Sequence, residues 1–113
     1  MAFEHVADYD DLAPGEARFV ELAEPVCVVK LVDGSVKAVH DTCSHQQYPL
    51  HEGWIDDNEI ECGLHGSTFD LDTGKPQGLP AVKSIPVYAC KVEDGRVYVD
   101  LDDQLNDAPV PRH

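Results

Sequence analysis

A thiol and an imidazole stand close together at two places in this sequence. One residue separates Cys43 from His45, two residues separate Cys62 from His65, and sixteen residues lie between the two pairs. Cysteine thiolates and histidine imidazoles are ligands for both zinc and iron. The stretch 43–65 therefore predicts a metal centre that is held by two mixed pairs of ligands.

Spacing alone leaves three interpretations open. Two unrelated thiols on exposed loops are unusual in a reducing compartment, where free thiols are reactive. A structural zinc site accepts two sulfur and two nitrogen ligands, but zinc motifs usually pair Cys with Cys and His with His. A two-iron, two-sulfide cluster suits mixed pairs, because one iron takes two thiolates and the other takes two imidazoles.

Composition limits the classes of partner. The 113 residues carry 8 Lys and Arg against 22 Asp and Glu, a formal charge of −14. Phosphate repels such a surface, so neither nucleic acid nor an anionic membrane is expected as a partner, whereas a basic protein surface is. No apolar run is long enough for a membrane span, and the start has no signal-peptide pattern, so we expect a cytoplasmic protein.

The elements that must position the two pairs are predicted to be strands. Asp33-Gly34 and Asp94-Gly95 each divide an apolar stretch into a hairpin, over 25–40 and 88–101. Further strands are expected at 17–24, 58–62 and 67–75. The prediction is an all-β fold, a small antiparallel sandwich or barrel with a two-loop cluster-binding subdomain. It has one domain over 1–101, with the subdomain at about 41–81, and a flexible polar tail over 102–113.

The two boxes resemble the ligand motif of Rieske proteins, C-x-H followed by C-x-x-H. Residues outside the two motifs are similar to the same family as well. Pro49-Leu50 follow the first motif, Gly66 follows the second, and Pro80 lies in the stretch 78–80. The resemblance implies one [2Fe-2S] cluster per chain and a Rieske-like fold over most of 2–101. Cys43 and Cys62 would bind one iron, and His45 and His65 the other.

Neighbouring residues indicate which branch of the family the chain resembles. Respiratory members carry a disulfide at the positions of Tyr48 and Leu64, and neither residue is cysteine here. Ser67 matches a hydroxyl donor of those members, but Phe69 stands where they have tyrosine. The resemblance is therefore to the soluble branch, which has lower reduction potentials. The other cysteines, Cys27 and Cys90, are expected to be buried free thiols. His51 has two interpretations, a surface histidine, which is preferred, or a residue near the cluster.

That branch contains ferredoxins of bacterial aromatic ring-hydroxylating dioxygenase systems. The resemblance implies a one-electron carrier, not an enzyme by itself, between a flavin-containing ferredoxin reductase and a terminal oxygenase. The small subunit of assimilatory nitrite reductase is the alternative within the family, and a structural zinc-binding interaction module is the alternative outside it. Partner docking is expected at Gln46, Gln47, Pro49 and Leu50, with further contacts at Tyr48, Leu64, Leu79 and Pro80 and electrostatic steering by Glu52, Asp56, Asp57 and Glu59.

Overall fold

Two antiparallel sheets form the protein. The computed structural model describes residues 3–42, 49–56, 58–61, 68–76, 84–106 and 108. The larger sheet has the order β1-β9-β8-β4-β3-β2, and the smaller has the order β5-β6-β7. The larger consists of β1 (Glu4–Asp8), β2 (Glu16–Glu21), β3 (Pro25–Lys30), β4 (Val36–His40), β8 (Val87–Glu93) and β9 (Arg96–Gln104). The smaller consists of β5 (Trp54–Asp56), β6 (Glu59–Glu61) and β7 (Thr68–Asp70), and two 3-10 turns are η1 (Tyr9–Asp11) and η2 (Leu50–Glu52).

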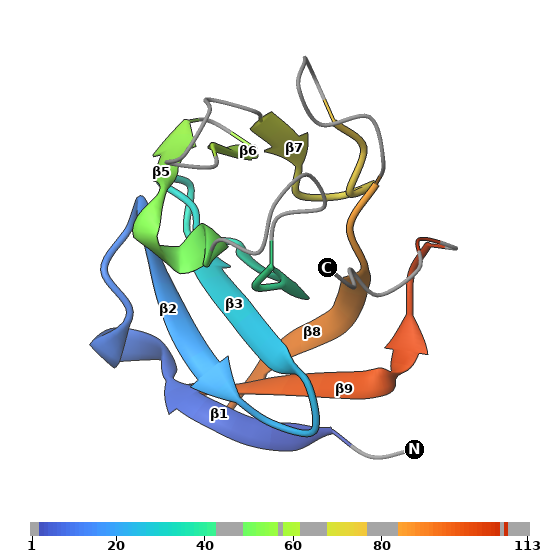
Figure 1. Cartoon of the computed structure of the whole chain (residues 1–113). Coiled ribbons are helices and arrows are strands. Elements are labelled where there is room, and N and C mark those ends of the chain that lie inside the picture. The colour runs from blue at the N-terminus through green and yellow to red at the C-terminus, as the bar shows by residue number, and fades with distance from the viewer. Residues whose placement is uncertain are drawn as a thin grey trace.

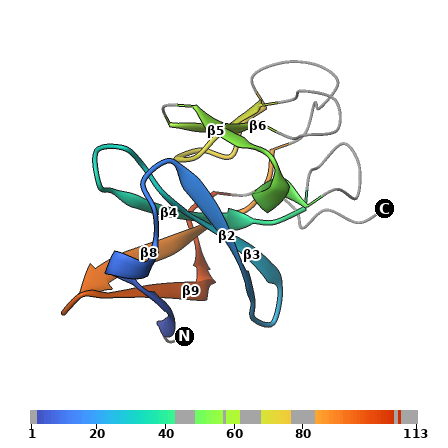
Figure 2. The ribbon, with the colours of Figure 1, turned by 90° about the vertical axis from the view of Figure 1, so that its left-hand side faces the viewer.

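The smaller sheet lies at one end of the larger one. Figure 1 shows β5, β6 and β7 above the curled larger sheet, and the turned view in Figure 2 keeps the same arrangement. This confirms the predicted all-β antiparallel fold with a smaller subdomain. Within the part of the chain that is described, no helix is long and apolar enough to cross a membrane.

Both predicted hairpins are present. Asp33-Gly34 joins β3 to β4, and Asp94-Gly95 joins β8 to β9. Asp94 has φ 54° and Gly95 has φ 75°. Positive φ at both central residues matches the right-handed twist of the flanking strands, which explains why Asp-Gly is a strong hairpin signal.

A continuous apolar strand divides the core into two clusters. Val26 and Val28 of β3 pack on one face of the larger sheet, with Val97 and Val99. Cys27 and Val29 point to the other face, where residues of both sheets meet; among them are Val39, Leu50, Ile60, Phe69, Leu71 and Ile85. Because alternate residues face opposite sides, a strand that is buried on both faces is apolar throughout.

The predicted C-terminal boundary is wrong. We expected the domain to end at residue 101 and the tail to fray, but β9 continues to Gln104. Asn106, just beyond it, is hydrogen-bonded to Val87 of β8, to Ile85 just before that strand and to Thr73 in the turn after β7. The sequence did not indicate this because 102–106 is held by hydrogen bonds of polar groups and not by an apolar pattern. Residues 107 and 109–113 lie outside the described residues.

The prediction for the two remaining cysteines is confirmed. Cys27 is fully buried and Cys90 is partly buried, and both are free. Burial raises the pKa of Cys90 to about 12. It also raises the pKa of Cys27 well above its ordinary value, with a smaller contribution from the charge of Asp41. Both thiols therefore stay protonated and unreactive at neutral pH.

Candidate metal centre

The four predicted ligands fall in segments that the structure does not describe. Cys43 and His45 belong to residues 43–48, here called the first loop, and Cys62 and His65 belong to residues 62–67, the second loop. Gln46, Gln47, Tyr48, Leu64, Ser67, Leu79, Pro80 and Asp57 also lie outside the described residues. The candidate centre is therefore characterised by the strands that carry the two loops.

Both loops have six residues and are closed at their bases by antiparallel pairs. Thr42 pairs with Pro49 across the first loop. Glu61 pairs with Thr68 across the second, as the last pair of β6 and β7. The first loop leaves the larger sheet after β4, and the second connects two strands of the smaller sheet. Each loop, which contains one cysteine and one histidine of the sequence, is therefore closed by a backbone pair at its base.

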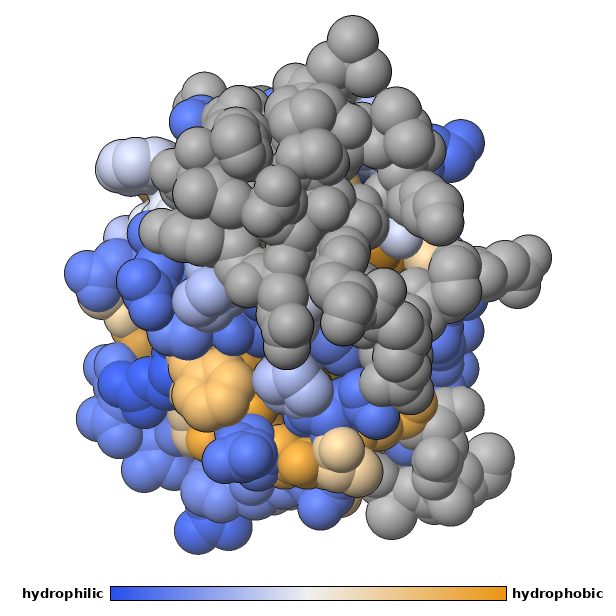
Figure 3. All heavy atoms as spheres, in the orientation of Figure 1, coloured by the Kyte–Doolittle hydropathy of each residue, from blue (hydrophilic) through white to orange (hydrophobic). Residues whose placement is uncertain are grey.

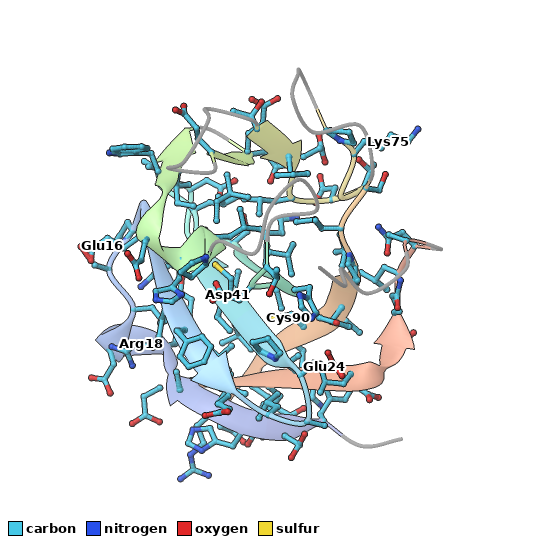
Figure 4. All side chains as sticks on the ribbon, viewed as in Figure 1. Glu16, Arg18, Glu24, Asp41, Lys75 and Cys90 are labelled. Atoms are coloured by element: carbon cyan, nitrogen blue, oxygen red, sulfur yellow. The ribbon has the colours of Figure 1, made fainter. Side chains whose placement is uncertain are left out.

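Asp41 ties together the two sides of the first loop. Its backbone carbonyl accepts a hydrogen bond from the Leu50 amide at 2.6 Å. Its carboxylate accepts one bond from the His51 amide at 2.8 Å and another from His51 Nδ1 at 2.6 Å. Burial raises the pKa of Asp41, and the hydrogen bonds and charge of His51 act in the opposite direction. Figure 4 shows Asp41 inside the molecule.

His40 fixes the residue before the first cysteine. The amide of Thr42 donates to His40 Nδ1 at 3.2 Å, so in the neutral ring the proton is on Nε2, which lies 3.2 Å from Glu24 Oε1. The backbone is held as well, because the His40 amide donates to Pro86 O at 2.9 Å and the Asp41 amide donates to Pro25 O at 3.0 Å. The stem of the first loop is thus bonded on both sides.

The stem of the second loop depends on a close backbone contact. A Cβ atom on Gly53 would lie only 1.7 Å from the carbonyl oxygen of Glu61, the residue before Cys62. Ile60 and Phe69 of the same small sheet are fully buried between the sheets. Trp54, which pairs with Glu61, is 62% exposed on the outer face.

Gly53→Ala is expected to disturb this stem. The added methyl group has to displace backbone, so we expect the free energy of unfolding to fall by roughly 1–3 kcal/mol. Chemical denaturation followed by circular dichroism measures the change. Val32→Ala, at a side chain that is 83% exposed, is the control and should leave stability unaltered. Equal stability of the two variants would show that β5 and β6 do not need this contact.

The structure corrects one predicted docking residue. Leu50 has no exposed surface and belongs to the core between the sheets, so it cannot contact a partner. It was predicted to contact a partner because uncharged residues at the rim of the ligand loops suit a transient interface, but Leu50 lies in η2 with its side chain buried. Pro49 is half-buried.

Phe69, predicted to lie near the cluster, is fully buried in β7 next to the second loop. Figure 3 shows an apolar patch at the level of β2, where Phe19 is 42% exposed.

Two features of the site were missed from the sequence. The side chain of His51 is only 28% exposed, and its Nδ1 is bonded to Asp41 rather than to solvent. Its ring also packs against Phe19, with 5.1 Å between the ring centroids. The polar run His40-Asp41-Thr42 directly before the first cysteine was the available signal, because polar residues at the end of an apolar strand often anchor the following loop.

The donor set fits a mixed-ligand iron–sulfur cluster. Two loops of equal length, one from each sheet, each offer one thiol and one imidazole, as one iron with two sulfur ligands and one with two nitrogen ligands requires. Among the described residues, no group of three or more His, Cys, Asp or Glu side chains is arranged to hold a metal ion. The described cysteines, Cys27 and Cys90, are protonated core residues and do not compete as ligands.

Comparisons with known proteins agree with this donor set. A family model described as the Rieske [2Fe-2S] domain matches residues 3–89. The ferredoxin component of biphenyl 2,3-dioxygenase from Rhodococcus jostii (strain RHA1) is 42% identical over 103 residues, which cover 90% of this chain and 95% of the relative.

Solved structures agree in fold. A chain in the complex of reduced oxygenase and oxidized ferredoxin of carbazole 1,9a-dioxygenase has a TM-score of 0.83 and 34% identity, with 90% of this chain and 94% of that chain covered. A protein described as an NADH-dependent nitrite reductase small subunit, from Mycobacterium tuberculosis, has a TM-score of 0.79 and 29% identity, with coverage of 87% and 93%. The chain belongs to the Rieske [2Fe-2S] family and is one of its ferredoxin-type electron carriers.

Proposed function

We propose that this chain carries one electron at a time from a flavin-containing ferredoxin reductase to a terminal ring-hydroxylating oxygenase in the cytoplasm. The 42% identity to a dioxygenase ferredoxin component, over nearly the full length of both chains, carries the proposal. The similarity to a ferredoxin chain in a complex with its oxygenase supports the electron acceptor. The flavin-containing donor follows from the same assignment.

Cys43, His45, Cys62 and His65 are proposed to hold the cluster. Bound there, the cluster accepts one electron more readily than a site with four thiolates, because two of its ligands are neutral imidazoles. The protein contributes two stems: Asp41 and His51 close the first loop, and the β6–β7 pair closes the second. Fixed stems reduce reorganisation when the electron arrives or leaves.

The nitrite reductase small subunit remains the second candidate. It is favoured by the fold similarity to a protein described in that way, at 29% identity. The ferredoxin relative has higher identity over a similar share of the chain. A small subunit is expected to copurify with a large catalytic subunit when expressed from its own genome, whereas a ferredoxin is expected to be isolated alone.

Turnover with purified components tests the main proposal. NADH, a flavin-containing ferredoxin reductase and a ring-hydroxylating oxygenase from the same organism should consume an aromatic substrate only when this protein is added. Catalytic amounts should suffice, because each molecule is reduced and oxidised repeatedly. Substrate oxidation at the same rate without the protein would contradict the proposal.

Reduction by the reductase is expected to depend on salt. The net charge of −14 favours a basic partner surface. Glu52 is 59% exposed and directly follows His51, which is hydrogen-bonded to Asp41. Glu59 and Glu61 are partly exposed on β6. Raising the ionic strength from about 0.01 M to 1 M shortens the Debye length from about 30 Å to about 3 Å, so stopped-flow reduction should become slower. A rate that is independent of salt would exclude steering by these acids.

A further inference from the structure

The side chain of Asn106 uses its full hydrogen-bonding capacity. Its Oδ1 accepts from the Val87 amide at 3.1 Å and from Gln104 Nε2 at 3.0 Å. Its Nδ2 donates to Thr73 O at 2.8 Å and to Ile85 O at 2.8 Å. A carboxamide has two donor hydrogens and two acceptor lone pairs, and all four are engaged. A fully satisfied network of this kind rigidifies the groups that it joins.

The partners of Asn106 come from the larger sheet, from the segment before β8 and from the turn that follows β7 of the smaller sheet. Thr73 follows β7 of the smaller sheet, whereas Val87 begins β8 and Gln104 ends β9 of the larger one. Next to Thr73, the Gly74 carbonyl accepts a bond from the Ile85 amide at 2.9 Å. A Cβ atom on Gly74 would lie 2.1 Å from Ile85 O and 2.7 Å from Asn106 Nδ2. Asn106 therefore occupies a tight polar joint between the sheets.

Each side of this joint connects to the stem of one loop. On the larger sheet, Pro86 lies between two partners of Asn106, and its carbonyl accepts the His40 amide at the end of β4, three residues before Cys43. On the smaller sheet, Thr73 is joined to Asp70 Oδ1 at 3.0 Å, and Asp70 ends the strand that follows the second loop. The distance between the two stems thus depends on the joint.

A four-ligand metal site needs its stems in a defined relation. Metal–ligand bonds tolerate only about 0.2 Å of variation, and here one pair of proposed ligands comes from each sheet. We propose that Asn106 is a positioning residue for the cluster: it sets the orientation of the first loop relative to the second, although it follows the last strand. The inference rests on the proposed ligand set of Cys43, His45, Cys62 and His65.

If Asn106 only fixed the C-terminal segment, not all of its hydrogen bonds would be explained. That segment has its own attachments, because the Leu105 amide donates to Val87 O at 2.7 Å and Gln104 Nε2 donates to Ala108 O at 2.7 Å. Both Nδ2 bonds of Asn106 go to carbonyls on the two sides of the joint, at Thr73 and Ile85. These two bonds therefore hold the turn after β7 and the segment before β8 together.

Three variants of the cluster-loaded protein test the inference. Asn106→Ala removes all four bonds. Asn106→Asp keeps the shape and the acceptor oxygen but loses both donors to Thr73 and Ile85. Leu105→Ala is the matched control, because this neighbouring side chain is 59% exposed. Hydrogen exchange of the Val87 amide reports on the joint, and the reduction potential and the electron paramagnetic resonance spectrum of the reduced form report on cluster geometry.

The inference predicts a coupled result. In Asn106→Ala, the Val87 amide should exchange about tenfold faster, as expected for the loss of one partly buried hydrogen bond. At equal cluster content, the resonance lines should shift or broaden and the potential should change, whereas Leu105→Ala should match the wild type. Asn106→Asp should change the spectrum in the same sense, and it carries the test if Asn106→Ala does not fold.

Two outcomes would overturn the inference. Faster exchange with an unchanged spectrum and potential would mean that Asn106 only stabilises the fold, and unchanged exchange would mean that it does not brace the joint. An Asn106 variant with wild-type cluster absorption and wild-type spectra would therefore contradict the positioning role of Asn106 and leave the proposed ligand set intact. A wild-type protein without cluster bands would instead refute the proposed ligand set.

Discussion

Cys62→Ser is expected to abolish the visible absorption of the purified protein. Serine does not supply the thiolate that iron requires, so the cluster should not assemble. Because metal binding is coupled to folding, the melting temperature should fall as well. Cys43→Ser should behave in the same way. Absorption spectroscopy, iron analysis and thermal denaturation measure the three effects.

Cys90→Ser is the matched control for the ligand variants. Cys90 is a partly buried free thiol of β8, and it belongs to no group of potential metal ligands among the described residues. The control protein should keep its full iron content and colour. A Cys62→Ser protein with the same iron content and colour as Cys90→Ser would refute the ligand assignment.

The reduction potential is expected to be level near neutral pH and to fall at alkaline pH. An imidazole that binds iron through one ring nitrogen keeps a proton on the other, and a ferric ion makes this proton leave at a lower pH than in free imidazole. Reduction reverses part of that effect, so the reduced form retains a proton that the oxidised form has lost. The potential should then fall by about 59 mV per pH unit for each coupled proton.

Protein-film voltammetry from neutral to strongly alkaline pH measures this slope. A ferredoxin whose cluster has four cysteine ligands is the control, because it has no ligand proton to lose and its potential should stay level. If the present protein gave the same level line, His45 and His65 would not be ligands to the cluster.

The sequence was sufficient where the structure is determined locally. Asp33-Gly34 and Asp94-Gly95 specify their hairpins through backbone conformations that neighbouring residues do not change. The apolar stretch over 25–40 was predicted to form strands, and β3 and β4 lie there. The short strands at 58–62 and 67–75 were also found, as β6 and β7, because their turn residues delimit them.

The sequence was insufficient where the partner is distant. Strands β1 and β5 were not predicted, since β1 pairs with β9 at the other end of the chain and β5 has only three residues. Asp41 and His51 are ten residues apart, and their hydrogen bond depends on the turn η2, in which His51 lies. Asn106 lies in a polar tail, and only the meeting of the two sheets gives it partners.

The predicted docking residues show that the fold, and not the local sequence, decides which apolar side chains are exposed. Leu50 was predicted to contact partners because apolar residues next to a ligand loop suit a transient interface, yet its side chain fills the core. Phe19 lies more than thirty residues before His51 in the sequence, yet it packs on the His51 ring and is partly exposed there. Only the fold places β2 next to His51.

A Mössbauer spectrum of the oxidised protein, purified from cells grown on ⁵⁷Fe, distinguishes iron atoms by their ligands. One iron bound by two cysteines and one bound by two histidines have different ligand fields, although both are ferric. For the proposed ligand set we expect two quadrupole doublets of equal area. A single doublet for all the iron would indicate identical sites with four cysteine ligands, and protein without iron would contradict the cluster altogether.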